Sequence, residues 1–240
     1  MCGRFSQERP ASELAEIFAA EPLADELGPR WNVAPTDEAF VVVQRAERRA
    51  ISAFRWGLIP HWADGPKIAA RTFNARSESL AVNSSFRDAF RRKRCLVPVD
   101  GFYEWHRQEG RRQPYAIAPR DGGPLALAGL WAGWRDPAAD VVVRTFTIVT
   151  TAPNVQLGWL HDRMPVVVPE SHWDRWLDPE LTEPAELNAL FEPSDDVELD
   201  IWPVGELVNN VRNDGPELIE RVDPAPTQPA QPGLFDRVLS

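Results

Sequence analysis

Residues 125–151 carry the sequence LALAGLWAGWRDPAADVVVRTFTIVTT, two apolar runs separated by the turn pair Asp136-Pro137. The second run, 141–151, is rich in the β-branched residues that strands favour, and the first, 125–131, is equally apolar. Their proximity along the chain indicates two neighbouring strands in the buried part of a sheet. We therefore place the centre of the fold here.

Similar apolar segments flank this centre on both sides. We expect further strands at 40–43, 51–59, 95–99, 115–118 and 166–168, and helices at 11–20, 78–92, 171–177 and 183–191. Regular alternation of strand and helix is missing, which argues against a parallel βαβ sheet. The pattern predicts an α+β fold: a single domain over 1–222, with a mainly antiparallel twisted sheet or barrel and flanking helices. The Pro- and Gln-rich residues 223–240 predict a flexible tail.

Composition excludes several classes of protein. No segment is long and apolar enough to span a bilayer, and no signal peptide precedes the domain, so we expect a cytoplasmic monomer without membrane contact. The only cysteines are Cys2 and Cys95, too few for a disulfide framework. These cysteines and the four histidines lack the spacing of metal ligands, so we expect no metal and no cofactor.

Charge is distributed unevenly along the chain. The net charge is −10, but residues 1–120 hold 19 Lys and Arg against 15 Asp and Glu. Residues 121–240 hold 7 against 21. Binding of phosphate needs a local basic surface and not a basic total, so nucleic acid remains a possible partner for the N-terminal half. Arg4, Arg71, Arg76 and the basic run 91–94 are candidates for such a surface, although the run also fits a solvated helix end.

Cys2 follows the initiator methionine directly. Methionine is normally removed before so small a side chain, which would leave an N-terminal cysteine with its amine and thiol on adjacent carbons. Unperturbed, these groups titrate near ~8 and ~8.5, so both have a nucleophilic fraction at neutral pH. A 1,2-aminothiol of this kind condenses with an aldehyde, first to a Schiff base and then to a five-membered thiazolidine.

Eight motifs occur in order along the chain. They are MCGRF at 1–5, WNVAPT at 31–36, RWGLIP at 55–60, NARSE at 74–78, RCLVP at 94–98, GFYEW at 101–105, FTIVTTA at 146–152 and HDRMP at 161–165. This series resembles the SRAP family, the SOS response-associated peptidases that shield abasic sites in single-stranded DNA. The resemblance runs from Met1 to about Val211 and implies an abasic-site processing enzyme.

The resemblance implies a catalytic set of Cys2, Asn74, Glu104 and His161. Cys2 would form the covalent bond, and Asn74 would hydrogen-bond its amine or a sugar hydroxyl. The aromatic neighbours of Glu104 would raise the pKa of its carboxyl, which suits proton exchange with the amine and the sugar oxygen. His161 would act as an acid and proton shuttle. His61, His106 and His172 lack matching flanks, and we expect them to be surface or packing residues.

The resemblance also implies a set of DNA-binding residues. Arg4, Arg76 and Arg163 are candidate phosphate contacts, because a guanidinium binds phosphate through two donors; each also fits a structural ion pair. Trp62 is a candidate for the DNA channel, where it would stack on a base. Trp56 and Trp105 fit either the core or this role.

Two alternative functions fit the same residues. A thiol peptidase or N-terminal-nucleophile amidohydrolase would use Cys2 as nucleophile, His161 as base and Asn74 to orient it, and could remove Met1. A DNA-binding module without catalysis would need none of these roles. The peptidase needs only the thiol, whereas thiazolidine formation also needs the α-amine. We favour the abasic-site enzyme, because a thiol peptidase has no need of a cysteine at the second position.

The tail contains Gln231-Pro232-Gly233-Leu234-Phe235-Asp236. Its spacing resembles the Gln-x-x-Leu-Phe peptide that docks bacterial proteins on the β sliding clamp. Leu234 and Phe235 would fill an apolar pocket and Gln231 would bond at its rim. Alternatively, the apolar pair folds back onto the domain.

Overall fold

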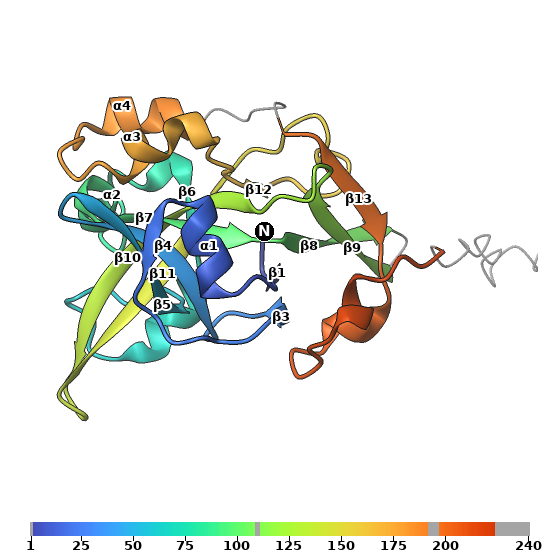
Figure 1. Cartoon of the computed structure of the whole chain (residues 1–240), viewed down its shortest axis with the longest axis horizontal. Coiled ribbons are helices and arrows are strands. Elements are labelled where there is room, and N and C mark those ends of the chain that lie inside the picture. Colours follow the sequence, from blue (N-terminus) through green and yellow to red (C-terminus); the bar gives the residue numbers. More distant parts are fainter. Residues whose placement is uncertain (1, 109–110, 192–196, 224–240) are drawn as a thin grey trace, which may run out of the picture.

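A computed structural model describes residues 2–108, 111–191 and 197–223 (Figure 1). The expected α+β architecture is confirmed, with two mainly antiparallel sheets and few helices. No helix in these described ranges is long and apolar enough to cross a membrane. The predicted tail begins at the very end of the last described range, so Gln231, Leu234 and Phe235 lie outside the described residues.

The larger sheet contains a closed five-stranded barrel. Successive pairings β11–β10–β7–β4–β5 are antiparallel, and β5 returns to β11 through a short parallel pairing that places Arg55 beside Thr145. The strands are β4 (Glu38–Arg45), β5 (Arg48–Trp56), β7 (Arg94–Val99), β10 (Leu125–Asp136) and β11 (Val141–Thr151). The two apolar runs at 125–151 therefore pair with each other at the centre of this sheet, as their sequence predicts.

Three short strands extend the barrel sheet: β2 (Ala20–Pro22), β6 (Asn74–Arg76) and β12 (Met164–Pro165). Both β6 and β12 pair with the C-terminal part of β11, at Ile148–Thr150 and Thr150–Thr151. This pairing brings the segment around Asn74 and the segment that follows His161 to the same end of β11.

The smaller sheet has five antiparallel strands in the order β13–β9–β8–β1–β3. They are β1 (Phe5–Gln7), β3 (Arg30–Val33), β8 (Gly101–Gln108), β9 (Arg111–Pro119) and β13 (Leu199–Pro203). In Figure 1, β1 lies between the barrel on the left and β8, β9 and β13 on the right. The N-terminal segment is thus held between the two sheets, beside the strand that carries Glu104.

The helices are short. They are α1 (Ala11–Ile17), α2 (Arg87–Arg92), α3 (Trp173–Leu177) and α4 (Pro184–Asn188), with 3₁₀ turns η1 (Pro66–Arg71), η2 (Ser77–Ser79), η3 (Glu170–His172), η4 (Ala189–Phe191), η5 (Glu206–Asn209) and η6 (Pro216–Ile219). Three of the α-helices, α2, α3 and α4, gather at the upper left of Figure 1, where their apolar side chains share one core with the barrel.

A second core fills the space between the barrel and the N-terminal strand. Trp56 stacks on Phe146 with ring centres 6.2 Å apart and contacts Phe5 at 4.9 Å. All three rings are completely buried, as is the thiol of Cys95. The expectation that Trp56 fits either the core or the DNA channel is therefore resolved in favour of the core.

Two predicted elements are shorter than expected. The helix predicted at 78–92 is helical only over Arg87–Arg92, because Asn83 accepts a hydrogen bond from the backbone of Ser85 and forms a turn instead. Residues 166–168, predicted as a strand, form one isolated bridge, between Val167 and Leu127, and β12 lies just before them at Met164–Pro165. Backbone hydrogen bonds of Val166 with Ala128 and of Val168 with Ala126 flank this bridge, and Pro169, which has no N–H to donate, follows it.

Candidate active site

Cys2 lies at the bottom of the site. It is completely buried, and its thiol donates a weak hydrogen bond to the carbonyl of Arg4 over 3.9 Å. Burial raises the pKa of the Cys2 thiol far above its ordinary value, and the charge of Glu104 raises it further. The thiol is therefore protonated at neutral pH in this arrangement.

Asn74 holds the backbone at Cys2. Its Nδ2 donates to the Cys2 carbonyl oxygen over 2.6 Å, a contact between residues 72 positions apart in the chain. The pairing of β6 with β11 fixes the position of Asn74. Its Oδ1 is buried and has no hydrogen-bond partner among the described residues. A buried acceptor of this kind is suited to accept a hydrogen bond from the N-terminal amine or from a substrate.

Glu104 is on β8, next to the N-terminal segment. Its side chain is only 4% exposed, and burial raises the pKa of its carboxyl above the ordinary value, with His161 partly opposing the shift. The sequence-based expectation of a raised pKa agrees in direction and in cause. A carboxyl whose pKa is moved toward neutrality can both give and accept a proton during a reaction.

His161 faces Glu104 across the site, with Nε2 4.0 Å from Oε2. On its other side, Nδ1 accepts the backbone N–H of Arg163 at 3.0 Å and lies 2.7 Å from Oδ1 of Asp162. Nε2 is therefore the ring nitrogen that faces Glu104, while Nδ1 is held by the two residues that follow His161. These contacts on both sides of the ring fix its orientation in the site.

A cleft of about 810 Å³ opens above these groups. It is lined by Gly3, Arg4, Phe73, Glu104, Trp105, His106, Arg107, Arg112, Gly158, Trp159, Leu160, His161, Asp162 and Asn209. Glu104 and His161 reach the cleft directly, while Cys2 and Asn74 lie behind its lining. The catalytic set that the sequence predicts is thus brought together at one place from two strands, the segment before β1 and a loop.

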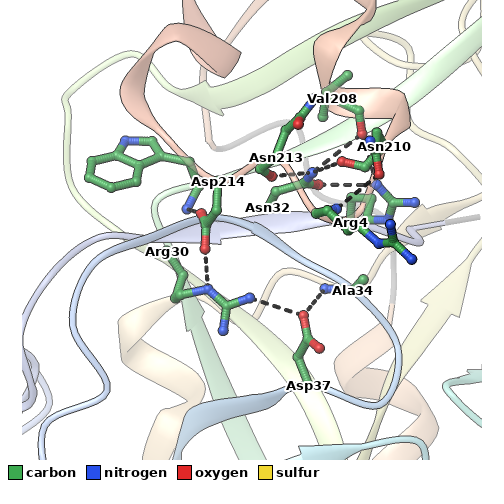
Figure 2. Close-up of polar contacts among 11 residues, drawn as sticks. Arg4, Arg30, Asn32, Ala34, Asp37, Val208, Asn210, Asn213 and Asp214 are labelled. Atoms are coloured by element: carbon green, nitrogen blue, oxygen red, sulfur yellow. Dashed lines mark hydrogen bonds and ion pairs between the residues drawn. The ribbon is translucent and has the colours of Figure 1, made fainter.

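Arg4 is one of the cleft-lining residues and is anchored from behind. Its Nη1 donates to Oδ1 of Asn32 at 3.1 Å and to the carbonyl of Val208 at 2.8 Å (Figure 2). Its guanidinium also lies 6.0 Å from the ring centre of Trp105. Burial lowers the pKa of Arg4, and Asp37 partly offsets this effect. Arg4 therefore offers its remaining donors to the cleft in a fixed orientation.

The other predicted DNA-binding residues do not line this cleft. Arg163 forms a bidentate pair with Glu78, at 2.5 and 2.9 Å, and donates to the carbonyl of Thr150. Arg76 is exposed at the end of β6, and Trp62, 49% exposed, donates to the carbonyl of Ser84 at 3.3 Å. Their roles in DNA binding stay predictions, and for Arg163 that role requires sharing the guanidinium with Glu78.

Sequence reasoning missed part of the cleft wall. His106, expected to be a surface or packing residue, lines the cleft together with Arg107, Arg112 and Trp159. The one available signal was position, since His106 and Arg107 directly follow the GFYEW motif. Trp159 precedes His161 by two residues, but a tryptophan in a chain with ten of them gave no reason to single it out.

Comparison with known proteins identifies the family. Residues 1–211 match the family described as SOS response associated peptidase (SRAP), and the chain belongs to it. It is 36% identical over 223 residues to the abasic site processing protein YoqW of Bacillus subtilis, covering 92% of this chain and 99% of that protein. It is 30% identical to the abasic site processing protein HMCES of Xenopus tropicalis, covering 83% of this chain and 68% of that protein.

The fold also matches a solved structure. A crystal structure of a protein from Bacteroides thetaiotaomicron superimposes with a TM-score of 0.84 and 24% identity, covering 92% of this chain and all of that one. The relatives YoqW and HMCES are both named abasic site processing proteins.

Proposed function

We propose that this protein binds abasic sites in single-stranded DNA and forms a covalent thiazolidine crosslink through Cys2 after loss of Met1. The crosslink would shield the lesion during replication, in the cytoplasm at the nucleoid. One observation carries the proposal: Asn74 holds the backbone of Cys2 directly behind a cleft into which Glu104 and His161 project. The abasic-site function of the named relatives supports the same conclusion.

The first stage of the reaction opens the sugar. An abasic deoxyribose is mainly a ring-closed hemiacetal, so its ring oxygen must gain a proton while its hydroxyl loses one. His161 can donate from Nε2, and Glu104 can accept, because burial keeps its pKa closer to neutrality than that of an exposed carboxyl. The product is the free aldehyde.

The second stage joins the aldehyde to the protein. The neutral α-amine of Cys2 attacks the aldehyde carbon, and the resulting carbinolamine loses one water to form an imine. The Cys2 sulfur then bonds to the imine carbon while the thiol proton passes to the imine nitrogen, which closes the five-membered ring. Because the buried thiol is protonated, the amine reacts first and the sulfur second. The net change is loss of one water.

The raised thiol pKa also bears on the peptidase alternative. A thiol peptidase needs a thiolate at neutral pH, usually paired with a histidine. Here the thiol contacts the carbonyl of Arg4, and its burial favours the protonated form. The proposal therefore includes no peptidase activity toward other proteins, and removal of Met1 by the protein itself stays a separate prediction.

The test is incubation with a single-stranded oligonucleotide that carries one abasic site, followed by a denaturing gel. The unmodified protein should give a heat-stable shifted band, and Cys95→Ala, the matched cysteine control, should give the same band. Cys2→Ala should lose it, and so should a variant with one extra residue retained in front of Cys2. A thiol-only mechanism predicts that the extended variant keeps its activity, and that result would refute the proposal.

For the tail, we propose from its sequence that Gln231, Leu234 and Phe235 bind the bacterial β sliding clamp. Binding through this segment would raise the local concentration of the domain at the replication fork. Calorimetric titration of a peptide covering 228–240 into purified clamp tests this. No binding at tens of micromolar, or binding unaffected by Leu234→Ala with Phe235→Ala, would refute it.

A further inference from the structure

The β8–β9 hairpin presents two positively charged side chains to the cleft. Arg107 on β8 and Arg112 on β9 are directly opposite each other in the antiparallel ladder, and both are exposed and line the cleft. Within the described ranges no carboxylate lies within ion-pair distance of either guanidinium. Like charges at directly opposed positions destabilise a hairpin, so this pair is suited to an anionic partner from outside the chain.

Trp105 fixes one of these arginines relative to the site. The guanidinium of Arg112 lies 5.7 Å from the centre of the Trp105 ring, and Arg4 lies on the same ring at 6.0 Å. The ring itself is oriented by a 2.6 Å hydrogen bond from Nε1 to Oδ1 of Asn209. Arg112 is therefore held against the ring that Arg4 also contacts, and not extended freely into solvent.

Trp159 provides an aromatic surface at the same cleft, against the opposite face of the β8–β9 ladder. Its ring contacts His106 at 5.4 Å and Tyr115 at 5.2 Å, both nearly perpendicular, yet half of the residue stays exposed. It lines the cleft two positions before His161. A large ring that is fixed by two neighbours and still open to solvent is well suited to stack on a planar ligand, because little entropy is lost on binding.

We propose that Arg107, Arg112 and Trp159, here called the basic–aromatic wall, bind the nucleotide adjacent to the abasic residue. The arginines contact its phosphate, and Trp159 stacks on its base. The inference rests on the proposed function for the presence of a DNA strand in the cleft. Because the lesion has no base of its own, stacking can come only from a neighbouring base. The wall thus adds affinity that the reactive sugar cannot supply.

Binding without chemistry tests the proposal independently of crosslinking. The probe is a single strand with one tetrahydrofuran analogue, which has no aldehyde and cannot react with Cys2. Replacing both Arg107 and Arg112 with Gln should lower the slope of log affinity against log salt by about 1.4, or about 0.7 per lost phosphate contact. The control Arg111→Gln removes one positive charge from the same hairpin, at an exposed residue outside the cleft lining, and should leave the slope unchanged. Equal slopes for the double variant and this control would overturn the phosphate contacts.

A double-mutant cycle tests the stacking. Trp159→Ala should weaken binding by between about five- and about 100-fold, the range for loss of one base stack, whereas Trp159→Phe should retain most of it. A second analogue placed on the 5′ or 3′ side of the first removes one neighbouring base. On one of these sides, the wild-type protein should lose affinity and Trp159→Ala should lose none. Equal losses of affinity for both proteins on both sides would overturn the stacking. The control Val155→Ala, on the same loop, should behave as the wild type.

Discussion

Replacement of Asn32 by Ala should lower the free energy of unfolding, because Asn32 lies behind the cleft-lining Arg4 and holds several buried groups together. Asn32 is completely buried, and its Nδ2 lies within hydrogen-bond distance of the carbonyls of Val208, Asn210 and Asn213, at 3.4, 3.1 and 2.9 Å. Its Oδ1 accepts from Arg4. Figure 2 shows this side chain at the centre of the contacts that join strand β3 to the segment after η5.

The expected magnitude follows from the groups that lose their partner. An unsatisfied buried polar group costs about 1–3 kcal/mol. The carbonyl of Val208 keeps its bond from Arg4, and Asn210 lies at the surface, where water can replace the lost donor. We therefore expect the free energy of unfolding to fall by about 1–3 kcal/mol in total. For a domain of this size each kcal/mol lowers Tm by about 2–4 °C, so Tm should fall by roughly 2–12 °C.

Thermal denaturation followed by circular dichroism measures this change. The matched control is Asn210→Ala, because the Asn210 side chain is exposed and its backbone carbonyl, which faces Asn32, is retained. Arg4 should also lose one of its two anchors in Asn32→Ala, which should weaken binding to single-stranded DNA. An unchanged Tm in Asn32→Ala, or the same loss in both variants, would refute the assignment of Asn32 as the centre of this network.

Three further predictions concern the catalytic and binding residues. Glu104→Gln should be more stable than the wild type, by an amount that increases as pH rises from about 4.3 to the pKa of Glu104 in the folded protein. Burial raises this pKa, so ionisation of Glu104 costs folding free energy. Thermal melts in which the Tm difference between the two proteins does not change with pH would contradict this prediction. His161→Ala should slow crosslinking by roughly 10²–10⁴-fold in single-turnover gels while binding of undamaged strands is retained, and equal loss of both would assign His161 a structural role instead. Arg76→Gln should lower the slope of log affinity for DNA against log salt by about 0.7 without changing Tm. Arg163→Gln should lower Tm, because it breaks the ion pair with Glu78. Equal Tm values for the two variants would contradict this difference between a binding and a structural arginine.

The sequence predicted which candidate catalytic residues lie together better than it predicted the shape of the cleft. Cys2, Asn74, Glu104 and His161 each stand in a motif with a recognisable order, and the fold brings them together. The strands at the centre were predictable because their apolar residues are buried on both sides of the barrel wall. The α+β class followed from the absence of regular alternation.

Long-range contacts account for what the sequence could not predict. Closure of the barrel depends on a short parallel pairing of Arg55 and Trp56 with β11, which no local pattern reveals. Asn32 appears in a motif, but the three carbonyls that its Nδ2 contacts lie more than 170 residues away. Likewise, Trp159 becomes part of the site only because it packs against His106 and Tyr115 from the second sheet. Such roles depend on tertiary structure and not on local sequence.

Intact mass spectrometry of the crosslinked product tests the central claim most directly. The proposed thiazolidine requires the mass of the protein without Met1 plus that of the abasic oligonucleotide, minus one water. Borohydride distinguishes it from a Schiff base of equal mass, because reduction adds two hydrogens to an imine and none to a closed thiazolidine. We predict a product of this mass that borohydride leaves unchanged. An adduct that retains Met1, or one that gains two hydrogens on reduction, would contradict the role of Cys2 as an N-terminal aminothiol.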